Sequence, residues 1–272
     1  MNTTTSLASS SASHTRGTAP QVWDRLWRHV PSAARDDELL TRERRSPRWS
    51  LFVARLEATF GSLVGLRTIE LGSGRGDLSV LLAERGADVT LFDASDVGLD
   101  QARRRFDRRN LPASFVRGDL LGPLDEWTGQ FHVALSSGVI EHFAGDERTR
   151  AVRAHHEVLR DGGLTMISVP NALCPSYRLW KCYLELRGWW PYGLELPYTK
   201  SELLRRAHDV GFFRTDARCV GFWQSVGDHW GRSILKRTPD WANRRSILDN
   251  AMGMSLLLFG WRDGDRSLGV SA

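Results

Sequence analysis

The sequence predicts an α/β fold in which helices alternate with the strands of one doubly wound, mostly parallel sheet. Two observations lead to this prediction. An apolar strand, a glycine-rich turn and a helix follow one another near residue 70, and further strand-like segments recur at crossover spacing. A chain of 272 residues accommodates one such domain with additions, and its 41% hydrophobic and 25% charged content is ordinary for a globular protein.

The first strand and its turn lie at 68–76, where the chain reads TIELGSGRG. Apolar and β-branched residues lead into Gly72, Gly74 and Gly76, and an apolar, helix-prone run follows at 78–84. Glycines at such a turn allow the bare backbone to approach a ligand closely. This order of strand, turn and helix begins a nucleotide-type βαβ unit.

The turn differs from the dinucleotide-binding fingerprint G-x-G-x-x-G. If Gly72 and Gly74 are its first two glycines, the third would fall at position 77, which is Asp77. An acid suits the start of a helix but not the neighbourhood of a pyrophosphate. No lysine follows at P-loop spacing. The turn therefore predicts a ligand with an adenosine-like body and no phosphate.

Acidic residues end the next two predicted strands. The segment 87–92 precedes Asp93, which lies about twenty residues past the glycines, where βαβ nucleotide folds place the acid that binds ribose hydroxyls. The segment 113–118 is the third strand and precedes Asp119. An ordinary role in a turn at the strand end stays open for Asp119.

The remaining elements continue the alternation. The sequence predicts a fourth strand followed by VIEHF, a fifth after a glycine turn, a helix with Ser201 as its N-cap and Gly211 at its end, and two last strands. Their ranges are 132–138 for the fourth strand, 159–171 for the turn and fifth strand, 201–213 for the helix, 214–222 for the sixth strand and 254–261 for the seventh.

These motifs together resemble those of class I S-adenosylmethionine (SAM) methyltransferases. ELGSGRG resembles the family's motif I, and LSSGVIEHF with LRDGGLTMISVPN is similar to its small-molecule branch, where G-V-x-E-H-F is frequent. The resemblance extends over about 66–213. It implies a Rossmann-like sheet of seven strands with an antiparallel last strand, SAM as cofactor, and methyl transfer as the reaction.

The resemblance also implies which residues bind the cofactor. The glycine turn would hold the methionine part, Asp93 the ribose and Asp119 the adenine. Glu70 would bond backbone amides of the turn or the amino group of the cofactor, or support the loop. The predicted cofactor-binding residues are Glu70, Gly72, Ser73, Gly74, Gly76, Asp93, Ala94, Asp119, Leu120, Ser137 and Gly138.

Glu141 and His142 are the predicted catalytic residues, because they follow the fourth strand, which faces the reacting centre in such folds. Histidine accepts a proton near neutral pH, so His142 is a candidate general base for a hydroxyl acceptor. Ordering of the loop or contact with the cofactor is the alternative role for His142. No group of His, Asp or Glu shows metal-ligand spacing, so no metal site is predicted.

Additions surround the predicted sheet. The aromatic-rich insertions 172–199 and 223–250 begin near the ligand-binding edge of the sheet, so we expect them to form a cap over a hydrophobic acceptor. Helical spacing within 21–60 predicts an N-terminal lid beside the cofactor, and the Ser-, Thr- and Ala-rich segment 1–20 predicts a disordered tail.

Charge and cysteine content bound the remaining possibilities. The net charge is +5, and five arginines within 103–109 are predicted to lie mostly on an exposed helix face, which makes nucleic acid an unlikely partner. Three cysteines without a C-x-x-C pair favour the cytoplasm, and no apolar run reaches the length of a transmembrane segment.

The predicted function is methyl transfer from SAM to a small-molecule acceptor, with oxygen as the first choice of methylated atom and nitrogen or carbon left open. An RNA or protein methyltransferase and a non-catalytic module of the same fold are the alternatives. A dehydrogenase is disfavoured by Asp77. The acceptor and the oligomeric state are not predicted.

Overall fold

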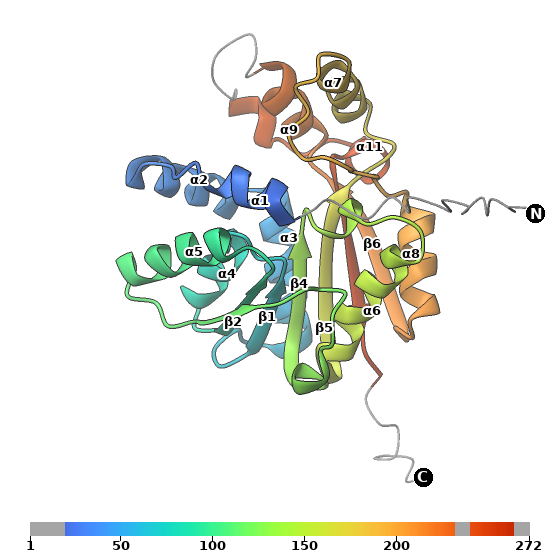
Figure 1. Cartoon of the computed structure of the whole chain (residues 1–272). Helices are drawn as coiled ribbons and strands as arrows, with labels where there is room; N and C mark the ends of the chain where they lie inside the picture. The colour runs from blue at the N-terminus through green and yellow to red at the C-terminus, as the bar shows by residue number, and fades with distance from the viewer. Residues whose placement is uncertain (1–19, 232–239, 264–272) are drawn as a thin grey trace, which may run out of the picture.

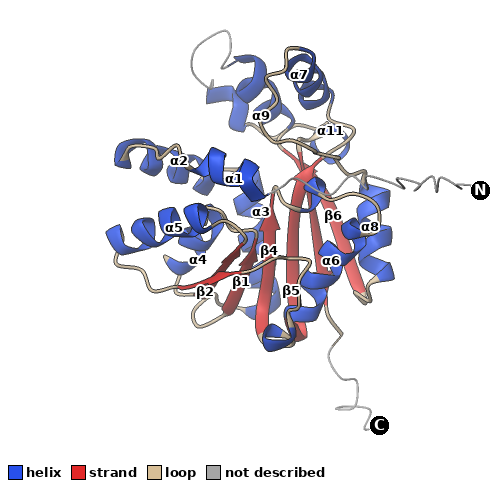
Figure 2. Ribbon diagram, in the orientation of Figure 1, coloured by secondary structure: helices blue, strands red, loops and turns tan. Residues whose placement is uncertain are grey.

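The computed structural model describes residues 20–231 and 240–263 and contains a seven-stranded mixed sheet with helices on both faces (Figures 1 and 2). The predicted tail 1–20 therefore lies, except for Pro20, outside the described residues. The strand order is β3-β2-β1-β4-β5-β7-β6. The strands are β1 (Arg67–Leu71), β2 (Asp88–Asp93), β3 (Ser114–Arg117), β4 (Phe131–Ser137), β5 (Leu159–Pro170), β6 (Arg214–Val220) and β7 (Ser255–Trp261).

The direction of the strands confirms the predicted fold class. Strands β1 to β5 pair in parallel, and β7 inserts antiparallel between β5 and β6. The strand order reverses at β1 and β4, which lie side by side. In doubly wound sheets the ligand crevice lies outside the carboxyl ends of the strands at this switch point.

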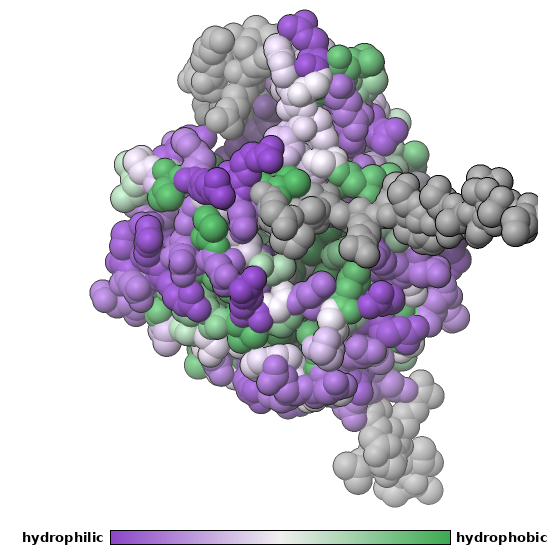
Figure 3. Space-filling view, viewed as in Figure 1, coloured by the Kyte–Doolittle hydropathy of each residue, from purple (hydrophilic) through white to green (hydrophobic). Residues whose placement is uncertain are grey.

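Helices cover the sheet as two layers, each with its own hydrophobic core. One core joins α2 to α5 with one sheet face, and the other joins α6 and α8 with the opposite face. Most of the surface visible in Figure 3 is hydrophilic, as expected for helices whose apolar residues face the sheet. The helices are α1 (Pro20–Trp27), α2 (Ala33–Arg44), α3 (Pro47–Phe60), α4 (Asp77–Ala83), α5 (Asp96–Arg108), α6 (Glu147–Val158), α7 (Pro175–Leu186), α8 (Lys200–Asp209), α9 (Phe222–Val226) and α11 (Asp249–Met252).

Several boundaries differ from the prediction. The N-cap of helix α8 lies two residues earlier than expected, because the hydroxyl of Thr199, and not that of Ser201, accepts the capping hydrogen bond from the Glu202 amide. Strand β5 includes the glycine turn at 161–163 that we expected to precede it. Helix α2 was not predicted at all, because its sequence is strongly polar and carries little helical periodicity.

The arginine run on α5 is only partly an exposed face. Arg103, Arg104 and Arg108 are exposed, whereas Arg105 is buried and bonds to Asp36 of α2. The Arg105 guanidinium also contacts the Arg75 carbonyl and pairs with Asp77. Ion pairs with acids on α2 and α4 therefore occupy part of the run and fix α2 against α4 and α5.

The two insertions lie together beyond the carboxyl ends of β4, β5 and β6, where α7, α9 and α11 form a cap (Figure 1). Asn171, directly after β5, anchors both of them. Its side-chain amide donates to the carbonyls of Ala251 and Gly253, while its Oδ1 accepts from the Leu173 amide. Both insertions are therefore fixed to the sheet at one side chain.

Candidate cofactor and acceptor site

A cavity of about 1520 Å³ lies at the carboxyl ends of the strands, between the glycine turn, α1 and the cap. It is lined by every predicted site residue except Gly74. The residues of the prediction that line it are Glu70, Gly72, Ser73, Gly76, Asp93, Ala94, Asp119, Leu120, Ser137, Gly138, Glu141 and His142. The structure therefore brings these predicted residues together around one cavity, although the lining alone does not assign a role to any of them.

The glycine turn requires residues without a side chain. Gly72 has a φ of +72°, and a Cβ there would lie 2.6 Å from Cγ2 of Val139. Gly74 has a φ of +50°, and a Cβ there would lie 2.5 Å from the indole of Trp27 on α1. Trp27 packs directly on this glycine, which explains why Gly74 does not line the cavity.

Asp93 links the end of β2 to the turn. Its Oδ2 accepts the Gly74 amide at 2.7 Å, and its Oδ1 accepts the Ser95 amide at 2.7 Å. Burial raises the pKa of this carboxyl above its ordinary value, while the backbone hydrogen bonds act in the opposite direction. Each oxygen keeps a free lone pair, so the same carboxylate that fixes the turn can accept further hydrogen bonds from a ligand.

Glu70 supports the loop rather than the turn amides. Its Oε2 accepts from the amide of Ser79 at 3.1 Å and from the Ser79 hydroxyl at 2.6 Å, so it fastens β1 to the first turn of α4. Burial raises its pKa to about 7.

Asp119 has the role in a strand-end turn that the sequence left open. Its Oδ1 accepts a hydrogen bond from the Leu121 amide at 2.9 Å. Asp119 also lines the cavity.

Helix α1 covers the cofactor side of the cavity, and its residues were not among the predicted site residues. Trp23, Asp24 and Trp27 line the cavity, and Oδ1 of Asp24 accepts a hydrogen bond from the Ser95 hydroxyl at 2.6 Å. The signal was present in the string QVWDRLW, whose tryptophans are spaced four residues apart on one helix face.

Only part of segment 21–60, which we predicted to be a lid, lies over the cavity. Helix α1 lies over the cavity, whereas α3 packs into the hydrophobic core beneath the sheet. From α3 only Arg48 lines the cavity, and its guanidinium donates to the Ser137 hydroxyl at 2.5 Å while pairing with Glu43.

Glu141 and His142 lie in a short helix, η2 (Ile140–His142), directly after β4, and both side chains are buried. Nδ1 of His142 lies 2.6 Å from the Leu194 carbonyl and therefore carries the proton, which leaves Nε2 as an acceptor. Burial lowers the pKa of His142 to about 4 and raises that of Glu141 to about 8. The imidazole is consequently neutral near pH 7.

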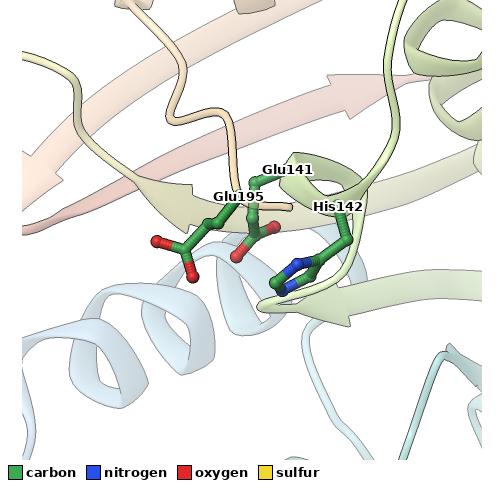
Figure 4. Close-up of side chains that lie close together, drawn as sticks. All are labelled: Glu141, His142 and Glu195. Atoms are coloured by element: carbon green, nitrogen blue, oxygen red, sulfur yellow. The ribbon is translucent and has the colours of Figure 1, made fainter. Parts of the chain in front are cut away.

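The cap adds a third acid to this pair. Figure 4 shows Glu141 and His142 extending from η2, and Glu195 extending from a separate loop toward the same space. The Tyr177 hydroxyl on α7 donates to Oε1 of Glu195, and burial raises the pKa of the Glu195 carboxyl. No sequence pattern indicated Glu195, because it lies 54 residues beyond Glu141 in an irregular insertion.

Aromatic side chains form the wall of the cavity on the cap side. The indole of Trp23 meets the His142 ring edge-to-face, with 4.7 Å between centroids, and Tyr192 packs edge-to-face against Trp190, with an angle of 71° between the rings. The remaining aromatic residues that line this wall are Tyr177, Trp180, Trp189 and His229. Such a wall suits a hydrophobic or planar ligand.

Comparison with known proteins bears on the segment that contains the glycine turn and η2. Residues 69–163 match the model of the family described as "Methyltransferase domain". Over these residues the chain is similar to a methyltransferase domain. The resemblance of the sequence motifs to those of SAM-dependent methyltransferases implies SAM as the cofactor of such a domain. The site fits that cofactor, since Gly72, Ser73 and Asp93 line one cavity and each oxygen of the Asp93 carboxylate can accept a further hydrogen bond.

Two curated relatives carry the name ubiquinone biosynthesis O-methyltransferase. The protein from Ruegeria pomeroyi is 35% identical over 150 residues, which cover 53% of this chain and 59% of the relative. The protein from Methylobacterium nodulans is 28% identical over 175 residues, which cover 63% of this chain and 69% of the relative. The chain thus matches only a little over half of the length of the first relative.

Solved structures share the fold over most of the chain. A SAM-dependent methyltransferase from Thermotoga maritima, titled a possible histamine N-methyltransferase, has a TM-score of 0.58 at 16% identity and covers 89% of this chain and 99% of its own. The magnesium protoporphyrin IX methyltransferase from Synechocystis PCC 6803, solved with bound S-adenosylhomocysteine, has a TM-score of 0.56 at 18% identity, covering 89% and 93%. Within the described residues, no helix combines the length and apolarity needed to cross a bilayer.

Proposed function

We propose that this chain methylates a hydroxyl group of a small hydrophobic molecule, which binds in the aromatic-lined part of the cavity. One observation carries the proposal: a single cavity joins the glycine turn and Asp93 at one end with Glu141, His142 and the aromatic wall at the other. The names of the curated relatives support oxygen as the methylated atom.

The chemistry divides between cofactor and protein. SAM, when bound, supplies a methyl group on a positively charged sulfur, which keeps the electron pair of the breaking carbon–sulfur bond. The residues of the chain hold the acceptor in line and exclude water. The proton of the acceptor hydroxyl leaves at the Glu141–His142 corner, where Nε2 of His142 is the free nitrogen, while the acceptor oxygen forms the new bond to carbon.

Position and protonation support this role for His142. The Leu194 carbonyl fixes the imidazole in one tautomer, which keeps Nε2 available. Its pKa of about 4 makes the ring neutral at physiological pH, although such a low pKa also makes it a weak base. Proton removal at this corner therefore depends on acidifying the acceptor hydroxyl as well as on His142.

A small molecule is favoured over RNA as the acceptor. The basic run on α5 is partly neutralised, because Arg105 and Arg109 pair with Asp36 and Asp37. The cap side of the cavity is lined mainly by aromatic residues, and none of the described residues that line it there is an arginine or lysine that could pair with a phosphate backbone. Steeply salt-dependent RNA binding would instead favour the alternative.

Calorimetric titration with SAM and with S-adenosylhomocysteine tests the cofactor half of the proposal. We expect micromolar binding in the wild-type protein and at least about tenfold weaker binding in Asp93→Ala, since two charge-assisted hydrogen bonds are lost. Asp100→Ala, an exposed acid on α5, is the matched control and should bind normally. Absence of binding by the wild-type protein would overturn the enzymatic proposal.

The acceptor half is tested by screening hydrophobic phenols and alcohols for methyl transfer in the presence of SAM. Once an acceptor is found, His142→Ala should lower kcat with the affinity for SAM unchanged. Full turnover in that variant would exclude any role of His142 in activating the acceptor.

A further inference from the structure

Three metal-binding side chains from two distant segments converge on one wall of the cavity. Glu141 and His142 belong to η2, and Glu195 belongs to the cap (Figure 4). One ligand atom from each residue lies within 4.8 Å of the others. Nitrogen and oxygen ligands bind a first-row metal ion at about 2.0 to 2.2 Å, so small side-chain rotations bring all three atoms around one ion.

His142 is oriented as a metal-binding imidazole. Its Nδ1–H donates to the Leu194 carbonyl at 2.6 Å, so the lone pair of Nε2 is free. Metal-binding histidines usually donate their other ring N–H to a carbonyl or carboxylate, which fixes the ring and its tautomer. The acceptor carbonyl here is one residue before Glu195, so the same loop supplies one ligand and orients another.

Glu141 supplies an oxygen that lacks a partner. The residue is 1% exposed, and its Oε2 makes no hydrogen bond to the described part of the protein. A buried polar oxygen without a partner is unfavourable, and a bound cation is one way to satisfy it. Glu195 is oriented by the Tyr177 hydroxyl on its Oε1, which leaves Oε2 for a second interaction.

The nearby cationic side chains are engaged elsewhere. Lys181 pairs with Glu185 and lies over the Trp190 ring at 4.3 Å. Arg148 pairs with Glu202 and donates to the Leu196 carbonyl. Among the described residues, no cationic side chain forms an ion pair with either carboxyl of the cluster. Arg148 and Lys181 act on Glu141 and Glu195 only from beyond ion-pair contact, which leaves the cluster open to a cation from solution.

We propose that Glu141, His142 and Glu195 bind a divalent first-row transition-metal ion beside the acceptor position. One nitrogen and two carboxylate oxygens suit ions such as Mn²⁺ or Zn²⁺ better than Mg²⁺, which prefers oxygen ligands. Three protein ligands leave coordination positions open, as in catalytic metal sites.

The metal site goes beyond the proposed function and changes the role of one residue in it. A nitrogen that binds a metal cannot accept a proton, so His142 acts as a ligand when the ion is bound. The ion lowers the pKa of an acceptor hydroxyl that occupies an open position, and that proton then passes to solvent. This role requires no strong base at His142.

The test measures metal binding directly. Protein treated with a chelator and returned to metal-free buffer is titrated with Mn²⁺, followed by calorimetry and by the electron paramagnetic resonance signal of free Mn²⁺, and Zn²⁺ is the second probe. We expect one ion per chain and binding weakened at least about tenfold in Glu195→Gln. Glu157→Gln, the same change at an exposed position on α6, should bind as the wild-type protein does.

Separate readouts keep the proposal distinct from the methyltransferase activity. Glu195→Gln should keep the circular dichroism spectrum and the SAM affinity of the wild-type protein, since Glu195 lies on the cap. Absence of stoichiometric binding of either ion, or equal binding by Glu195→Gln, would overturn the metal site. Metal binding without SAM binding would leave the site standing and overturn the proposed function.

Discussion

The two ends of the cavity are built in different ways. At the cofactor end, β1, the glycine turn and Asp93 all come from one continuous βαβ unit, and Asp93 reaches back only to Gly74. At the cap end, His142 is oriented by a carbonyl 52 residues away, and Tyr177 orients Glu195 from another helix. A binding site made by neighbouring backbone is visible in sequence, whereas one made by tertiary contacts is not.

The largest expected effect tests how firmly the cofactor end is held. Arg105→Ala removes a buried guanidinium that bonds to Asp36, and leaves a buried carboxylate with fewer partners. We expect the free energy of unfolding to fall by about 3–5 kcal/mol, measured by urea denaturation. Arg103→Ala, which breaks an exposed ion pair on the same helix and removes the guanidinium from the Phe115 ring, should cost about 1 kcal/mol. If both variants lose the same free energy of unfolding, the buried ion pairs between α2 and α5 contribute no more to stability than an exposed pair does.

A comparison of Gly72 with Gly129 separates two costs of adding a side chain at the glycine turn: backbone strain and a clash with a neighbour. Gly72 and Gly129 have φ of +72° and +70°, but only at Gly72 would a Cβ meet a neighbour, at 2.6 Å from Val139. We expect Gly129→Ala to cost about 1–2 kcal/mol of stability from strain alone. Gly72→Ala should cost about 1–3 kcal/mol more and weaken SAM binding, as thermal unfolding and calorimetry will show. Equal effects would mean that Val139 moves away freely.

The pH dependence of the free energy of unfolding tests the packing of helix α6, which covers the sheet on the side of β4 and β5. His155 on α6 is fully buried, and burial lowers its pKa from an ordinary 6.5 to about 4. Between these values the unfolded chain binds the extra proton, so the free energy of unfolding falls as pH falls from 6.5 to 4. His155→Leu should remove about 1–3 kcal/mol of this pH dependence. The exposed His208→Leu is the control, and an unchanged pH profile in His155→Leu would place the acid sensitivity elsewhere.

The smallest expected effect is on SAM affinity, and it tests whether helix α1 contributes to the cofactor end of the cavity. Trp27 packs on Gly74 and lines the cavity, so Trp27→Ala should weaken SAM binding about three- to tenfold by calorimetry. Trp223→Ala is the control, because this tryptophan contacts Trp241 and does not line the cavity. Unchanged SAM affinity in Trp27→Ala would restrict the cofactor end to the βαβ unit.

The sequence predicted the elements of the sheet because strand, turn and crossover helix are each encoded locally. The glycine turn and Asp93 were recognisable from spacing alone; Gly72, Gly76 and Asp93 line the cavity, and their roles in cofactor binding stay predictions. The role of Glu70 was left open, because the sequence does not show that Ser79 faces its carboxylate. Glu195 was missed, because no periodic pattern relates an irregular insertion to η2, and Tyr177 was expected only as one of the aromatic residues of the cap.

The arrangement at Asn171 has a consequence for protein engineering. One amide side chain holds the starting point of the first insertion and the end of the second, while the glycine turn and Asp93 lie on other strands. Exchange of segment 172–199 for another sequence of similar length leaves this anchor and the cofactor end in place. Under the proposed function, such a graft would change the acceptor end, because it replaces Glu195 and the Leu194 carbonyl that orients His142, without redesign of the sheet.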